Sequence, residues 1–153
     1  MILFLTPKKY RLQILYTQIN RNKKNEPIFN TYSYGVDARK YFYPASCVKL
    51  PIAVLALEKA RSINELGIHD RYEILPGPIY KSGVNKDSSS ENGYPSLAHS
   101  IRKLFVVSDN SAYNYLYDFL GRDHINERLW ELGYKSSRTV SYTHLTLPTT
   151  WLV

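Results

Sequence analysis

The sequence has one cysteine and no long apolar run, and each shortage excludes a kind of protein. Cys47 alone forms neither an internal disulfide nor a cysteine-rich zinc site. The four histidines show no paired H-x-x-x-H spacing, so we expect no metal site and no cofactor. No apolar stretch approaches the roughly 20 residues of a membrane span, and the N-terminal MILFL is too short for the apolar region of a signal peptide. We therefore expect no membrane span, in a chain that either stays inside the cell or lacks its natural start.

The composition is that of one globular domain with a core of its own. Hydrophobic residues make up 44% of the 153 residues and charged residues 22%. A net charge of +7 would suit nucleic acid or an anionic surface. However, the densest basic cluster (Arg21, Lys23 and Lys24) lies in a polar turn, and no nucleic-acid-binding motif accompanies it. We expect no nucleic-acid partner.

The N-terminal third predicts a β-hairpin. Residues 11–19 and 28–36 are rich in β-branched and aromatic side chains, and the polar residues 20–27 between them form a turn. The first of these strands carries apolar residues on both faces, which predicts that it is covered on two sides.

The rest of the chain is predominantly helical. A helical pattern runs from Ser46 to about Ser62, and a polar segment, 67–95, follows that is long enough to hold short elements or to line a site. Helices are then predicted over 96–107, from the S-D-N triplet to Gly121, and from Asp123, as N-cap, to Gly133. A hairpin followed by helices indicates an α+β fold, with the hairpin as part of an antiparallel sheet.

The stretch FYPASCVKLPIAVLALEKA carries the first chemical signal. Ser46 and Lys49 share one face of the predicted helix. A buried lysine that is kept neutral can take the proton of a serine hydroxyl, and the helix N-terminus favours the negative charge that then develops. The alternative is a capping serine with a solvated lysine. The apolar run from Leu50 to Leu57 argues against it, because this run predicts a helix buried on most sides.

The second signal is the triplet Ser108-Asp109-Asn110 between two predicted helices. By itself it would be a good N-cap cluster. An S-x-x-K motif followed by S-D-N, with Tyr43-Pro44-Ala45 before the serine, resembles the class A serine β-lactamases and their relatives among penicillin-recognising hydrolases.

The resemblance implies a role for each matching residue. Ser46 would attack the lactam carbonyl and become acylated, with help from Lys49. Ser108 would relay a proton to the departing ring nitrogen, and Asn110 would bind the side-chain amide of the substrate. Asp109 would be structural, fixing its loop through hydrogen bonds to backbone N–H groups. The resemblance also implies a monomer, a small β-lactam or peptidoglycan-like substrate, and a periplasmic or secreted location.

The sequence departs from that family pattern toward its C-terminus. Lys81-Ser82-Gly83 has the letters of the third family motif but precedes S-D-N, so we take it as coincidence. The Glu-x-x-Leu-Asn context of the deacylating carboxylate is absent. Residues 140–149, VSYTHLTLPT, resemble a translated sequencing adapter, which predicts a partial domain over 1–139 and a non-native tail over 140–153. A natural β-rich tail is the alternative.

Three other functions stay open at this point. The same nucleophile motif serves D,D-peptidases and esterases, and also penicillin-binding sensor modules that are acylated but not regenerated. A basic binding protein without chemistry would leave Ser46 and Lys49 unexplained. Cys47 is adjacent to Ser46, but no histidine neighbours it in sequence, so we interpret it as a small buried packing residue.

Overall fold

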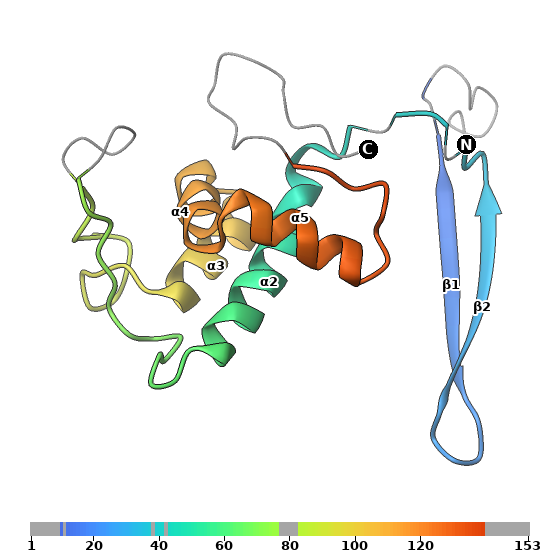
Figure 1. The fold of residues 1–153 in the computed structure, drawn as a ribbon, viewed down its shortest axis with the longest axis horizontal. Helices are drawn as coiled ribbons and strands as arrows, with labels where there is room; N and C mark the ends of the chain where they lie inside the picture. The colour runs from blue at the N-terminus through green and yellow to red at the C-terminus, as the bar shows by residue number, and fades with distance from the viewer. Residues whose placement is uncertain (1–9, 11, 38, 42, 77–82, 140–153) are drawn as a thin grey trace. The chain divides into compact units, whose positions relative to one another are not determined.

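The chain divides into an N-terminal unit, Met1–Tyr41, and a second unit, Phe42–Val153, in a computed structural model. The structure describes residues 10, 12–37, 39–41, 43–76 and 83–139. Figure 1 shows the strands in the first unit and the helices in the second. The predicted α+β class is confirmed.

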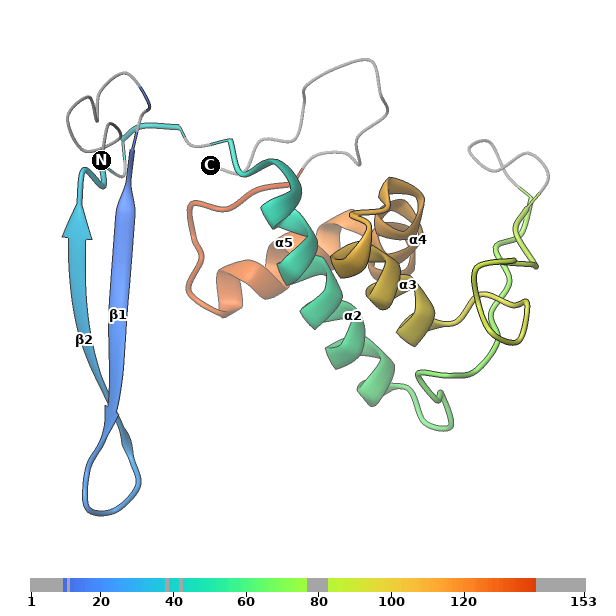
Figure 2. The same cartoon turned by 180° about the vertical axis from the view of Figure 1, so that it is seen from behind.

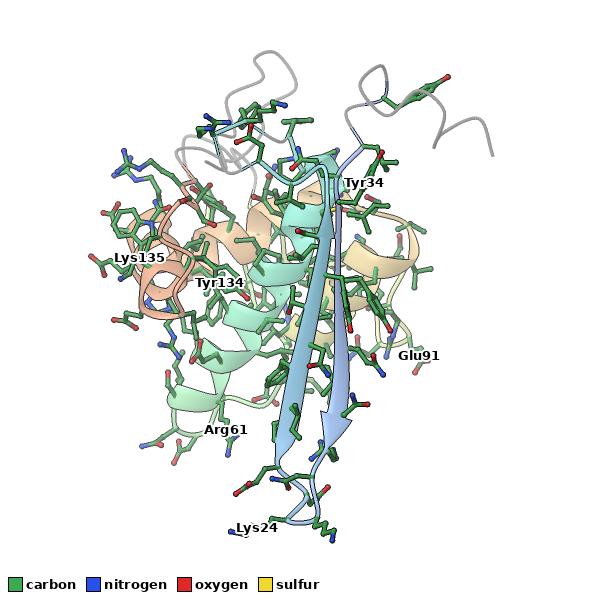
Figure 3. The ribbon with its side chains drawn as sticks, turned by 90° about the vertical axis from the view of Figure 1, so that its right-hand side faces the viewer. Lys24, Tyr34, Arg61, Glu91, Tyr134 and Lys135 are labelled. Atoms are coloured by element: carbon green, nitrogen blue, oxygen red, sulfur yellow. The ribbon has the colours of Figure 1, made fainter. Side chains whose placement is uncertain are left out.

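The first unit is an antiparallel hairpin of β1 (Ile14–Arg21) and β2 (Pro27–Tyr34). Its register pairs Ile14 with Tyr34 at the open end and Arg21 with Pro27 beside the turn. Figure 3 labels Lys24 in that turn and Tyr34 at the end of β2. The predicted hairpin is confirmed, with strand boundaries that differ by two or three residues at most ends.

Cross-strand pairs hold the hairpin together. The rings of Tyr16 and Tyr32 stack with centroids 6.1 Å apart on one face, and the hydroxyls of Thr17 and Thr31 hydrogen-bond at 3.0 Å on the other. All residues of both strands except Ile14 are exposed. In the part of the chain that the structure describes, the apolar side chains of β1 pair across the hairpin and stay exposed, so the prediction that this strand is covered on both faces is wrong.

The second unit begins with a short 3₁₀ turn, η1 (Ala45–Val48), that leads directly into α2 (Lys49–Ser62). Three helices follow, α3 (Leu97–Val106), α4 (Asn110–Leu120) and α5 (Arg122–Glu131). Helix α2 packs against α3 and α4, as Figures 1 and 2 show from opposite sides. The buried apolar side chains of these helices form one core: Ile52, Ala53, Leu55, Ala56, Ala60, Leu97, Leu104, Ala112, Tyr113, Leu116, Tyr117, Leu120, Ile125 and Leu129.

Helix α2 is buried on one face only. Ile52, Leu55 and Ala56 are at most 2% exposed, whereas Leu50 and Val54 are more than half exposed. The prediction that its apolar run is buried on most sides is wrong, since α3 and α4 contact a single side of the helix. The buried face nevertheless fixes the direction of α2 and hence the place where its first residue, Lys49, enters the core.

Polar side chains and glycine set the helix ends. Ser96 caps α3 by accepting from the N–H of His99 at 3.2 Å. Gly121, with φ +81°, separates α4 from α5, a conformation that glycine adopts without steric cost. Asp123 was predicted as the N-cap of the last helix, which is wrong: Gly121 occupies that position, and Asp123 lies in the first turn beside Arg122.

The C-terminal end of the described chain is fastened to the helices. The side chain of Asn126 on α5 exchanges two hydrogen bonds of 2.7 Å with the backbone of Thr139, and the Thr139 hydroxyl donates to Tyr117 on α4. The predicted non-native tail, 140–153, lies outside the described residues and stays a prediction. In the described part of the chain, no helix has the length and apolar character needed to cross a membrane.

Candidate active site

Ser46 lies in the η1 turn rather than at the start of a regular α-helix. The turn opens with Ala45 at φ +47°, in the left-handed region that residues with a Cβ rarely occupy, and the N–H of Cys47 donates to the carbonyl of Pro44. In a 3₁₀ turn, residues three apart lie almost above one another, so Ser46 is placed over Lys49. The Ser46 residue itself is exposed.

Lys49 is the buried end of this pair, with only 5% of its surface exposed. Its Nζ donates to the carbonyl oxygen of Ser108, to the Ser108 Oγ at 2.8 Å and to the Asn110 Oδ1 at 2.8 Å. Burial lowers the pKa of the Lys49 amine, and the nearby carboxylate of Asp109 opposes this effect in part. A solvated surface lysine is therefore excluded.

Ser108 connects the lysine to the serine. Its Oγ accepts from Lys49 and donates to the Ser46 Oγ at 3.1 Å. Ser108 has a φ of +54°, so the turn between α3 and α4 holds it in a strained conformation. The three side chains form a hydrogen-bonded chain from an exposed hydroxyl to a buried amine. The sequence suggested a direct pairing of Ser46 with Lys49, whereas the described contact between them runs through Ser108.

Asp109 has the structural role that was predicted for it. Its carboxylate accepts from the N–H of Ala112 at 2.7 Å and so caps α4. Its own N–H donates to the carbonyl of Lys103 at 3.3 Å, and its Oδ2 lies 3.7 Å from the Lys103 Nζ. These contacts hold the residues on either side, Ser108 and Asn110, in place beside Lys49.

The structure thus brings together the four predicted site residues, Ser46, Lys49, Ser108 and Asn110, from two segments far apart in sequence. Cys47 is exposed, so the prediction that it is a buried packing residue is wrong. The η1 turn directs this position away from the core that begins at Lys49. Lys81 and Ser82 of the out-of-order K-S-G triplet lie outside the described residues.

The long polar segment does line a cavity, but not beside the serine. A pocket of about 270 Å³ lies just beyond the C-terminal end of α2, between this segment and α4. Its lining comprises Leu66, Gly67, Asp70, Tyr72, Glu73, Ile74, Leu97, Tyr115, Leu116, Asp118 and Phe119. Since Ser46 precedes α2 and Leu66 follows it, the helix separates the pocket from the hydroxyl by roughly 20 Å at 1.5 Å per residue.

Sequence reasoning missed Lys103 and Asp87, which pair at 3.0 Å behind the S-D-N turn. Lys103 lies inside a helix and Asp87 in the polar segment, where each alone looks like a solvated charge. No motif spacing marks them. Among the described residues, no group of three or more histidine, cysteine, aspartate or glutamate side chains is placed to hold a metal ion.

Comparisons with known proteins identify the family of this chain. Residues 8–149 match the Beta-lactamase enzyme family, to which the chain therefore belongs. The crystal structure of a β-lactamase from Sphaerobacter thermophilus DSM 20745 aligns with a TM-score of 0.57 at 20% identity over 97% of this chain. The alignment covers 54% of that protein, so this chain spans about half its length. No curated protein matches the chain.

Proposed function

We propose that this chain carries the acylation half of a serine β-lactamase-type hydrolase, with Ser46 as the nucleophile. The observation that carries the proposal is the hydrogen-bonded chain from the Ser46 Oγ through the Ser108 Oγ to the buried Nζ of Lys49. The nucleophile and its base are thereby linked by groups within hydrogen-bonding reach, which is the geometry that an activated hydroxyl requires.

The first step is proton removal. When Lys49 is neutral, the Ser108 hydroxyl turns to donate to the Nζ lone pair, and the Ser46 hydroxyl donates to the Ser108 Oγ. The Nζ then takes the proton of Ser108, and Ser108 takes the proton of Ser46. The Ser46 oxygen then attacks the lactam carbonyl carbon and forms the tetrahedral intermediate. The N–H groups and the dipole at the start of the η1–α2 helix stabilise the negative charge on the carbonyl oxygen.

The second step opens the ring. The tetrahedral intermediate collapses, the carbon–nitrogen bond of the lactam breaks, and Ser46 retains the acyl group as an ester. Lys49, now protonated, returns its proton through Ser108 to the departing nitrogen, so that the amine leaves neutral. Asn110 accepts from Lys49 through Oδ1, which leaves the N–H groups of its amide to donate to a carbonyl on the substrate side chain.

The fate of the ester separates the candidate functions. A carboxylate that activates water would regenerate the enzyme, as a β-lactamase requires. A D,D-peptidase or esterase would turn over its own substrates but release β-lactams slowly, and a sensor would stay acylated.

We propose a β-lactam or peptidoglycan-like substrate, a monomeric enzyme and, from the family resemblance, a periplasmic or secreted location. We also propose that residues 1–139 are part of a larger domain.

Two experiments test the proposal. The gene is first sequenced across the codon for Arg138, and the complete protein that it encodes is purified. A chromogenic cephalosporin then reports ring opening, and intact-mass spectrometry with peptide mapping locates the acyl group. We expect a covalent adduct on Ser46 and, if a Glu-x-x-Leu-Asn segment is encoded, repeated turnover. The absence of both ring opening and an adduct would rule out an acylating enzyme.

A further inference from the structure

Lys103 contacts the S-D-N turn through both its backbone and its side chain. Its carbonyl accepts from the N–H groups of Val107 and Asp109, at 3.2 and 3.3 Å, where α3 ends. Its Nζ lies 3.0 Å from the Asp87 Oδ2 and 3.7 Å from the Asp109 Oδ2, and only 22% of the side chain is exposed. Lys103 therefore holds the backbone of the S-D-N turn and also places a positive charge beside the carboxylate of Asp109.

Asp87 holds this lysine from the long polar segment. Its carboxylate is 17% exposed and accepts from the N–H and hydroxyl of Ser89, while the Nε2 of His99 lies 3.5 Å away. Burial alone would raise the pKa of Asp87, but the hydrogen bonds from Ser89 and Lys103 outweigh it and hold that pKa at about 2. Asp87 is thus a permanent anion at neutral pH.

We propose that Lys103 is a positioning residue for acylation, which holds the Asp109 carboxylate and offsets part of its negative charge beside Lys49. The inference rests on the proposed function of Lys49 as the base that activates Ser46. Lys103 touches neither Ser46 nor a substrate. It acts through Asp109, the residue between Ser108 and Asn110.

The electrostatic argument follows from the charges around Asp109. Its carboxylate lies 3.7 Å from the Lys103 amine of α3, and its charge also acts on the Lys49 amine of α2 and on the phenol of Tyr115 on its own helix α4. The negative charge of Asp109 raises the pKa of Lys49, against the lowering that burial causes. A second amine beside Asp109 offsets part of that charge and repels the proton on Lys49. Removing the Lys103 charge should therefore keep Lys49 protonated to higher pH and make it a poorer base.

The first test measures acylation of the complete protein by a chromogenic cephalosporin between pH 5 and 10. Lys103→Met should slow acylation at pH 7 by roughly 3- to 30-fold, the range expected within one charge network, and should move the rise of the rate to higher pH. Lys103→Arg keeps the charge and should restore most of the rate. Lys135→Met removes a charge from an exposed lysine after α5 and controls for net charge.

The second test reads the electrostatics without catalysis. The side-chain carbons of the lysines are followed by ¹³C NMR during a pH titration, and Lys49 is assigned by the signal missing in Lys49→Arg. We expect the titration midpoint of Lys49 to rise in Lys103→Met but not in Lys103→Arg. In Asp87→Asn, Lys103 keeps its charge beside Asp109, so the midpoint should not rise. If the substitutions instead loosened the site in general, the Lys49 titration midpoint would shift in the same direction in Lys103→Met and in Asp87→Asn.

The outcomes separate this inference from the proposed function. An unmodified protein that shows no acylation at any pH overturns the function, and with it the role of Lys103 in acylation. If the unmodified protein is acylated but the Lys49 midpoint is the same in Lys103→Met, the inference alone is overturned. A rise in Lys103→Met that Asp87→Asn reproduces also overturns it, because disorder of the turn would then explain the result.

Discussion

The hydroxyl of Ser108 donates a 3.1 Å hydrogen bond to the hydroxyl of Ser46, although 62 positions separate the two residues. The contact exists because α2 and α4 share the same core, so the segments that precede the two helices meet at the same end. Neither segment is regular α-helix at the point of contact: Ser46 lies in a 3₁₀ turn and Ser108 in a strained turn. The packing of the helices therefore determines the geometry of the reaction, and several predictions rest on it.

Exposure of the complete protein to a reactive β-lactam should place one acyl group on Ser46. The neighbouring Cys47 is also exposed and is the natural competitor. We expect Cys47→Ala to keep the adduct and Ser46→Ala to lose it, as measured by intact mass and peptide mapping. An adduct that persists in Ser46→Ala would identify a different nucleophile.

Replacement of Lys49 by methionine should slow acylation by roughly 10²–10⁴-fold, the typical contribution of a general base. In the unmodified protein the rate should rise with pH as Lys49 loses its proton. Since burial lowers the pKa of this amine, the rise should have its midpoint below the ordinary lysine value of 10.5. Stopped-flow measurement of acylation against pH checks both points. An unchanged rate in Lys49→Met would contradict the proposed role.

Ser108→Ala removes the link between the nucleophile and the base. We expect acylation to fall by roughly 10²-fold or more, with thermal stability close to that of the unmodified protein, because among the described residues the Ser108 side chain hydrogen-bonds to Lys49 and Ser46 of the site. Ser136→Ala, at an exposed position after α5, serves as the matched control. Equal rates in the two variants would mean that Lys49 reaches Ser46 without Ser108.

The carboxylate of Asp87 should stabilise the fold in a pH-dependent manner. Its pKa in the folded protein is about 2, below the ordinary value of 3.8, so it contributes stability above pH 3.8 that is lost as the pH falls toward 2. Asp87→Asn should lower the free energy of unfolding at pH 7 by about 2 kcal/mol and flatten its acid dependence. Urea unfolding at several pH values measures this, with Asp123→Asn, an exposed carboxylate, as the control. Parallel acid profiles for Asp87→Asn and the unmodified protein would contradict the assignment.

Residues 1–153 expressed alone should neither melt cooperatively nor turn over a chromogenic cephalosporin. The hairpin has two strands whose side chains are almost all exposed, and isolated two-stranded hairpins are marginal in water. Circular dichroism on heating and a hydrolysis assay measure both properties. A sharp melt together with Ser46-dependent turnover would show that this chain is a complete enzyme.

The sequence was informative wherever local chemistry determines structure. Helix α4 begins after Asp109 and ends at Gly121, as a capping side chain and a glycine predict. The meeting of Ser46, Lys49 and the S-D-N triplet followed from the order of two motifs. Local pattern and motif order were enough to predict these features because each depends on a few neighbouring residues or on a known arrangement.

Features that depend on packing were beyond the sequence. The exposed side of α2 and the exposure of Cys47 depend on which elements cover the helix, and an apolar run is the same whether one or two faces are covered. The pairing of Lys103 with Asp87 could not be predicted from the sequence either, because only the fold brings a helical lysine to an aspartate in a long polar segment. Such pairs have no characteristic spacing.

The left-handed backbone at Ala45 and Ser108 has a consequence for how this protein can evolve. A residue with a Cβ costs roughly 1–2 kcal/mol in that conformation, which glycine avoids. Selection for heat resistance alone would favour glycine at both positions, yet glycine at 108 deletes the hydroxyl and glycine at 45 loosens the turn that presents Ser46. Lineages that adapt to heat should therefore gain their stability at other positions and keep alanine at 45 and serine at 108 in spite of the backbone strain.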